Sequence, residues 1–89
     1  MPQFVAEGPH TPEECATAGP EFAKMPGSKE LLDKTVWGCD FGKHHSWTIA
    51  DFADENEAKG FVPEIFRDRF TVTPVTVYTY DQMMEAHEG

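Results

Sequence analysis

The chain has 89 residues, 39% of them hydrophobic, and a formal net charge of -9 from 16 acidic and 7 basic side chains. This length predicts one domain over residues 1–89, near the lower limit at which a single chain buries a stable core. The excess of acidic residues argues against a phosphate backbone or an anionic lipid surface as a partner. We therefore expect neither nucleic-acid binding nor membrane binding.

The cellular environment is suggested by the N-terminus and by the cysteines. The N-terminus has no basic region followed by an apolar stretch, and no segment approaches the ~20 apolar residues of a membrane span. Only two cysteines, Cys15 and Cys39, are present, which is too few for a disulfide framework. We expect a cytoplasmic protein with reduced thiols.

The first quarter of the chain predicts a strand followed by a helix. Residues 3–7 are rich in apolar side chains and are closed by a Gly-Pro pair, which is typical of a short strand. Thr11 and Glu14 form the T-x-x-E pattern of a capping box, so a helix should span residues 12–25. Gly19-Pro20 should interrupt that helix with a kink or a break, because proline lacks the N–H donor that a helix interior needs.

Residues 35–52 predict a β-hairpin. Two strands, residues 35–41 and 45–52, would be joined by a type II′ turn with Gly42-Lys43 at its centre, and Cys39 would pair with Ser46. Side chains alternate between the two faces of a strand, so a one-residue change of register would reassign every face. The expected register places Trp37, Cys39, His44, Ser46 and Ala50 on one face, and Gly38, Asp40, His45, Trp47 and Ile49 on the other.

The second half of the chain predicts a further helix and strand. Asp54 is the expected helix cap, and an amphipathic stripe follows it until Pro63 divides the helix in two. Residues 71–78 are β-branched and aromatic, and Pro74 within them indicates an edge strand. Thr79 should cap a short C-terminal helix.

This order of elements, β-α-β-β-α-β, predicts an α+β protein with a ferredoxin-like fold. Its four-stranded antiparallel sheet would carry both helices on one face. The strand at residues 45–52 has apolar side chains on both faces, Trp47 and Ile49 on one and Ala50 and Phe52 on the other, and the helices can cover only one of them. A second copy of the chain is the simplest cover for the remaining face, so we expect a homodimer that associates through it.

Two sequence motifs support a family resemblance. Residues 10–15 read H-T-P-E-E-C, and residues 42–47 match G-x-H-x-x-W. Both are similar to motifs of small uncharacterised members of the dimeric α+β-barrel superfamily. The resemblance implies two ferredoxin-like sheets that face each other, with the fourth strand at a sheet edge and a small apolar cavity between the subunits. The superfamily includes cofactor-independent monooxygenases, isomerases, haem-degrading enzymes and nickel-binding proteins, so it implies no single activity.

The expected topology gathers chemically capable side chains at one end of the domain. The first strand, the first helix, the hairpin loop and the third strand all have an end there, while His87 should lie at the opposite end. Imidazole and thiolate are ligands for transition metals such as Zn, Ni, Cu or Fe, although no zinc-finger spacing or HExxH motif is present. Alternatively, the cysteines are small buried hydrophobic residues and the histidines lie on a turn. The candidate metal ligands are His10, Cys15, Cys39, His44 and His45.

Two other functions are compatible with the sequence. The first is a small-ligand site or a cofactor-independent monooxygenase or isomerase, in which a buried histidine or carboxylate acts as general acid or base. The second is a structural or interaction dimer without a ligand. For the enzyme, the catalytic candidates are His44, His45 and Asp40, with Glu7 as a further carboxylate, and the ligand-binding candidates are Trp37, Phe41, Trp47 and Tyr78.

Overall fold

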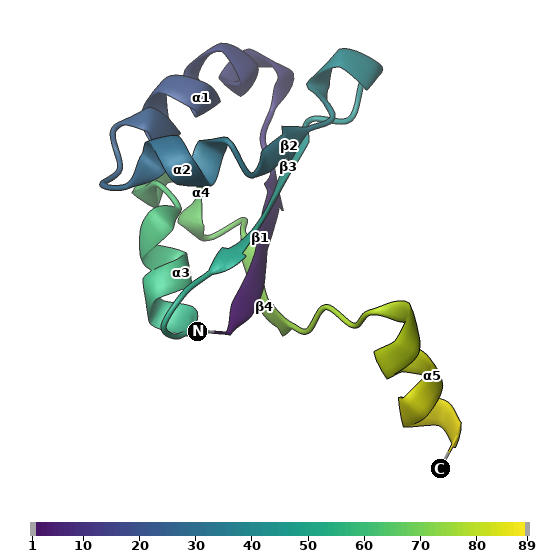
Figure 1. The fold of residues 1–89 in the computed structure, drawn as a ribbon. Coiled ribbons are helices and arrows are strands. Elements are labelled where there is room, and N and C mark those ends of the chain that lie inside the picture. Colours follow the sequence, from purple (N-terminus) through teal and green to yellow (C-terminus); the bar gives the residue numbers. More distant parts are fainter. Residues whose placement is uncertain (1, 89) are drawn as a thin grey trace.

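The computed structural model describes residues 2–88, with side chains through residue 85, so the side chain of His87 lies outside the described part. Figure 1 shows a sheet with a layer of helices on one side. The strands are β1 (Gln3–Pro9), β2 (Thr35–Trp37), β3 (His45–Asp51) and β4 (Thr71–Val75). The helices are α1 (Cys15–Ala23), α2 (Ser28–Leu32), α3 (Glu55–Phe61), α4 (Glu64–Arg67) and α5 (Tyr80–Glu88), with 3-10 turns at Pro12–Glu14 and Cys39–Phe41.

The predicted α+β class with a four-stranded antiparallel sheet is confirmed. The order across the sheet is β2-β3-β1-β4, and every neighbouring pair is antiparallel. β1 therefore lies beside β3, and β4 with its Pro74 lies at an edge, as the sequence predicted. An edge suits Pro74 because proline has no N–H to donate, and on the outer side of an edge strand there is no neighbouring strand to accept that hydrogen bond.

The core lies between the sheet and the layer formed by α1–α4 (Figure 1). In β1 and β3 buried and partly exposed side chains alternate, so each strand directs one row toward the helices. Aromatic side chains fill most of this space. Phe22 of α1 stacks on Phe66 of α4 with ring centroids 6.1 Å apart, and it also contacts Phe61 of α3 at 5.2 Å.

The expected hairpin turn is wrong. β2 ends at Trp37, which pairs with Ser46 of β3. The connection is therefore not a two-residue turn but a seven-residue loop that contains a 3-10 turn. The loop is closed by backbone hydrogen bonds, in which Gly38 N–H donates to the carbonyl of His45 and Lys43 N–H donates to the carbonyl of Gly38. Relative to the prediction the register has moved by two residues, and an even shift leaves the side chains that are still in the strands on their expected faces. The loop instead contains Cys39, Asp40 and His44.

The expected break at Gly19-Pro20 is also wrong, because α1 continues through Pro20. Ala18 and Phe22 on either side of the proline are buried in the core, and this packing outweighs the lost backbone hydrogen bond. The helical segment changes from 3-10 to α at Cys15 without a break. The division of the later helix at Pro63 is confirmed, since α3 and α4 are separate helices.

The C-terminal segment departs from the compact part of the molecule. β4 stops at Val75 rather than at the expected Tyr78, and α5 follows after an exposed connection. Thr79 caps α5 as predicted, since its hydroxyl accepts a hydrogen bond from Gln82 N–H and its N–H donates to the Gln82 side chain. Figure 1 shows α5 extending away from the sheet and the other helices. None of the helices that the structure describes combines the length and apolarity needed to cross a membrane.

Candidate metal centre

The segment that follows β1 supplies two side chains of the site. His10 comes directly after β1, and its backbone N–H donates to the carbonyl of His44 over 3.0 Å. Thr11 and Glu14 then form the predicted capping box, in which Thr11 N–H donates to the Glu14 carboxylate and Glu14 N–H donates to the Thr11 hydroxyl. This box fixes the chain so that Cys15 begins α1 facing His10.

The loop between β2 and β3 supplies the other two side chains. Cys39 opens the 3-10 turn, and His44 lies immediately before β3. Gly42 turns the chain between them at φ 82°, a left-handed conformation that glycine adopts without steric cost. The loop thereby brings both side chains to the side on which α1 begins.

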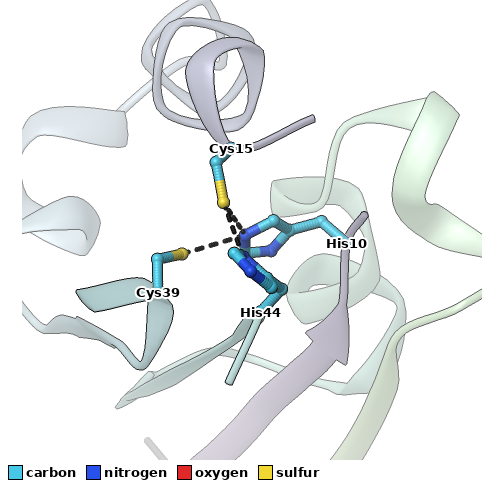
Figure 2. Close-up of side chains that lie close together, drawn as sticks. All are labelled: His10, Cys15, Cys39 and His44. Atoms are coloured by element: carbon cyan, nitrogen blue, oxygen red, sulfur yellow. Dashed lines mark hydrogen bonds between the residues drawn. The ribbon is translucent and has the colours of Figure 1, made fainter. Parts of the chain in front are cut away.

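Figure 2 shows the four side chains converging on one point from separate segments. His10 Nε2 lies 3.1 Å from Cys15 Sγ and 3.0 Å from Cys39 Sγ, and Cys15 Sγ lies 2.8 Å from His44 Nδ1. One ligand atom from each of the four residues lies within 4.8 Å of every other. Two thiols and two imidazoles therefore form a compact cluster, which we call the His2Cys2 cluster.

This spacing can be compared with a tetrahedral metal site. Zinc binds thiolate at about 2.3 Å and imidazole at about 2.0–2.1 Å, so its ligand atoms lie about 3.3–3.8 Å apart. The three distances above all join sulfur to nitrogen, and they are about 0.5–0.8 Å shorter than the corresponding edge of about 3.6 Å. A small outward movement of the side chains would make room for an ion at the centre of the cluster.

The surroundings of His10 favour its uncharged imidazole. Burial lowers the pKa of His10, which is only 6% exposed, and the neighbouring His44 lowers it further. A neutral imidazole has a free lone pair, which is the form that binds a metal. Burial raises the pKa of the Cys15 thiol, and the hydrogen bond with Cys39 adds to that effect. Without an ion the Cys15 thiol is therefore held in its neutral form.

A hollow of about 350 Å³ adjoins the cluster. Trp37 forms part of its wall and also contacts the cluster itself, with its ring 6.0 Å from that of His10. Both cysteines border this hollow, whereas His10 does not border it and is buried. The residues that line the hollow are Cys15, Gly19, Trp37, Cys39 and Asp40.

His45, the fifth candidate ligand, is not part of the His2Cys2 cluster. It is the first residue of β3, and its side chain lies on the face of the sheet away from the helices. There its Nε2 lies 3.2 Å from a carboxylate oxygen of Glu7, and its ring lies 4.6 Å from that of Trp47. The structure thus separates two histidines that are adjacent in the sequence.

The catalytic and ligand-binding candidates of the enzyme hypothesis do not converge on one cavity. Among the ligand-binding candidates, Trp37 lines the hollow, while Trp47 lies on the opposite face of the sheet. Phe41 is 90% exposed at the tip of the loop, and Tyr78 is exposed in the connection to α5. Of the catalytic candidates, His44 is in the cluster, Asp40 borders the hollow and His45 contacts Glu7.

Two residues that support the cluster were not predicted from the sequence. Arg69 makes a two-pronged contact with Glu14, with nitrogen–oxygen distances of 2.7 and 2.9 Å, and so anchors the start of α1 from 55 residues away. Nothing in the local sequence signals this pairing. Gly38 is the second, and the close spacing of Gly38 and Gly42 in G-C-D-F-G was the available signal for a loop in place of a tight turn.

The fold and the site together define a small α+β protein with a His2Cys2 cluster at one end of its sheet. Comparisons of the chain with protein-family models, with curated proteins and with solved structures found no match. The resemblance to the dimeric α+β-barrel superfamily therefore stays a prediction, and the function has to be argued from the geometry of the site.

Proposed function

We propose that the protein binds one transition-metal ion, and that zinc is the ion that suits the site best. The observation that carries this proposal is the convergence of His10, Cys15, Cys39 and His44, whose ligand atoms all lie within 4.8 Å of one another. The four side chains come in pairs from two segments that lie far apart in the sequence, and they point toward one another (Figure 2). A tetrahedral set of two sulfurs and two nitrogens is typical of zinc or of iron–sulfur centres.

The chemistry of a bound zinc ion here would be structural. Four protein ligands fill a tetrahedral zinc site and leave no position for a substrate or a water molecule. The ion would join the end of β1, the start of α1 and the loop before β3. In a domain of this size a metal link of that kind adds substantially to the folding free energy.

Metal analysis of protein produced without an affinity tag tests this proposal. We expect about one equivalent of zinc per chain, or stoichiometric rebinding of zinc after the metal has been removed. Cobalt in place of zinc should give the visible absorption of a tetrahedral ion together with a sulfur-to-cobalt charge-transfer band. Protein that carries less than about a tenth of an equivalent and rebinds neither zinc nor nickel would contradict the proposal.

The enzyme hypothesis is less well supported. A general acid or base would have to face the same space as the apolar ligand-binding residues, and His44, His45 and Asp40 lie in three different surroundings. We accordingly propose metal binding ahead of monooxygenase or isomerase activity.

We also propose that two copies of the chain associate through the face of the sheet that α1–α4 leave uncovered, as the family resemblance implies. Val36 and Ile49 on this open face are 62% and 49% exposed. Helix α5 adds exposed apolar side chains at Tyr80 and Met84, and a nine-residue helix is too short to be stable in water without packing against something. A second copy would cover both surfaces at once.

A further inference from the structure

The two cysteines are the members of the His2Cys2 cluster that border the hollow. Cys15 and Cys39 both line the hollow, whereas neither histidine does, and His10 is almost fully buried. The hollow is bordered by the flat ring of Trp37 and by Asp40, and its volume of about 350 Å³ is ample for a molecule of a few atoms. A small molecule that enters this hollow from solvent would therefore reach the two cysteines.

The sulfur atoms of these two cysteines are close to each other. Both lie at hydrogen-bond distance from one nitrogen, His10 Nε2, and their separation is within the 4.8 Å that bounds the cluster. A disulfide requires the sulfurs to approach to about 2.05 Å, a movement of under about 3 Å in total. Cys39 lies in a short surface loop between two glycines, which is the part of the site best able to make that movement.

We propose that Cys15 and Cys39 form a peroxide-sensitive pair, which hydrogen peroxide converts to an intramolecular disulfide with release of the bound metal. The release of metal rests on the proposed function, but formation of the disulfide does not. Nothing else in the cluster can replace the two lost thiolates, and two imidazoles alone hold zinc weakly.

The oxidation balances with one peroxide molecule as the oxidant. One thiolate sulfur attacks a peroxide oxygen, the O–O bond breaks, and the departing hydroxide takes up a proton to become water. The resulting sulfenic acid is then attacked by the second thiolate, so that an S–S bond forms and a second hydroxide leaves and is protonated. The two sulfurs lose two electrons, the peroxide gains them, and the products are one disulfide and two water molecules.

The experiment compares peroxide treatment of the zinc-loaded and the zinc-free wild-type protein. Intact mass should fall by two hydrogen atoms, and non-reducing peptide mapping should link Cys15 to Cys39. In the loaded protein a chromogenic chelator should detect one zinc ion released for each disulfide formed. Treatment with a dithiol reductant should then restore stoichiometric zinc binding.

His44→Ala is the variant that separates the two halves of the proposal, because it removes a ligand but neither sulfur. It should form the disulfide whether or not it binds zinc. If the wild-type protein bound no metal, but both it and His44→Ala formed the disulfide, the proposed function would be refuted and the peroxide-sensitive pair would stand. Oxidation that gives only sulfinic or sulfonic acid, only cross-links between chains, or no change in mass would overturn the peroxide-sensitive pair, whatever the zinc content.

Discussion

His44 and His45 are adjacent in the chain but differ in every neighbour. Side chains alternate at the start of an extended strand, so His44 faces α1 and contacts Cys15, while His45 faces the opposite side and contacts Glu7. The two residues form a matched pair, because they have the same side chain and adjacent positions in the sequence. Any difference between variants of these two residues has to come from which face of the sheet the imidazole occupies.

Three hydrogen bonds to the Glu14 carboxylate hold the start of α1 in place. The carboxylate accepts a hydrogen bond from the backbone of Thr11 and two from the guanidinium of Arg69. The contact with Arg69 is the larger cause of a pKa that falls from an ordinary value of 4.5 to about 2. Because Cys15 follows directly, the ionised carboxylate also helps to fix the direction of its thiol.

The lowered pKa of Glu14 predicts a specific dependence of stability on acid. The unfolded chain takes up this proton at a higher pH than the folded chain, so the stabilisation is complete above about pH 4.5 and is lost as the pH falls toward 2. In metal-free protein, Glu14→Gln should lower the free energy of unfolding at neutral pH and should flatten its decline below pH 4.5. Chemical unfolding across this range measures both effects.

Glu13→Gln is the matched control, since it removes a carboxylate from the same turn and leaves the Arg69 contact intact. A decline with acid that is equally steep in wild type and in Glu14→Gln would show that Arg69 does not hold Glu14 ionised in the folded protein.

At the scale of elements, the loop at residues 38–44 is the part of the fold that makes the cluster possible. Gly38 lies where the two ends of the loop come together, and a Cβ atom there would lie 2.6 Å from the carbonyl oxygen of Lys43. That distance is too short for carbon against a backbone atom, so any other residue has to displace the chain that carries Cys39 and His44. Gly60 in α3 has no atom within 4 Å of the corresponding position.

Gly38→Ala should therefore disturb the loop and weaken metal binding. We expect the dissociation constant for zinc to rise by about tenfold or more, comparable with the loss of a partner that orients a ligand. Gly60→Ala is the control: it should leave zinc affinity unchanged and stabilise the protein by about 0.5–1 kcal/mol, because alanine is the better helix former. Competition with a chelator of known affinity and thermal unfolding measure the two quantities, and equal zinc affinity in both variants would argue that the loop does not position Cys39.

At the scale of the whole molecule, one face of the sheet is covered by α1–α4 and the other is open (Figure 1). The covered face carries the aromatic core, and the open face carries Ile49, Trp47 and the pair of Glu7 and His45. The His2Cys2 cluster lies at the end of the covered side. Association through the open face and metal binding are therefore expected to be independent.

This independence can be tested with two isoleucines that are similarly exposed. Ile49 on the open face is 49% exposed, and Ile65 on α4 is 58% exposed. In sedimentation at micromolar concentration the wild type should have about twice the 10.0 kDa mass of the chain. Ile49→Glu should sediment as a monomer, because a buried carboxylate at the contact would be costly, while Ile65→Glu should stay dimeric and both should keep their metal. A wild-type protein of about 10 kDa would contradict the dimer.

Local signals in the sequence predicted much of this arrangement. The capping residues Thr11, Asp54 and Thr79 each mark the start of a helical segment, as their short-range hydrogen bonds require. The end of the domain at which the cluster lies also followed from the order of the elements. Such features depend on neighbours a few residues apart, which is why they are readable without a structure.

The predictions that were wrong concern features that depend on contacts between residues far apart in the sequence. Pro20 stays within α1 because Phe22 is held by aromatic rings from α3 and α4, and no local pattern records those contacts. The chain forms a long loop after Trp37 instead of a two-residue turn, because backbone hydrogen bonds from Gly38 and Lys43 stabilise the closed loop. His45 was included with His44 among the candidate ligands although the expected register already placed the two on opposite faces, and the structure keeps them apart.

The measurement that tests the central claim most directly is the zinc affinity of tag-free His44→Ala beside that of His45→Ala. The wild type and His45→Ala should bind one equivalent with equal affinity. His44→Ala should bind zinc more weakly by a larger factor than the about 10–100-fold that loss of an outer-shell partner costs, because a direct ligand is gone. Equal affinities in the two variants, or a wild-type protein that binds no zinc, would contradict a metal centre at His10, Cys15, Cys39 and His44.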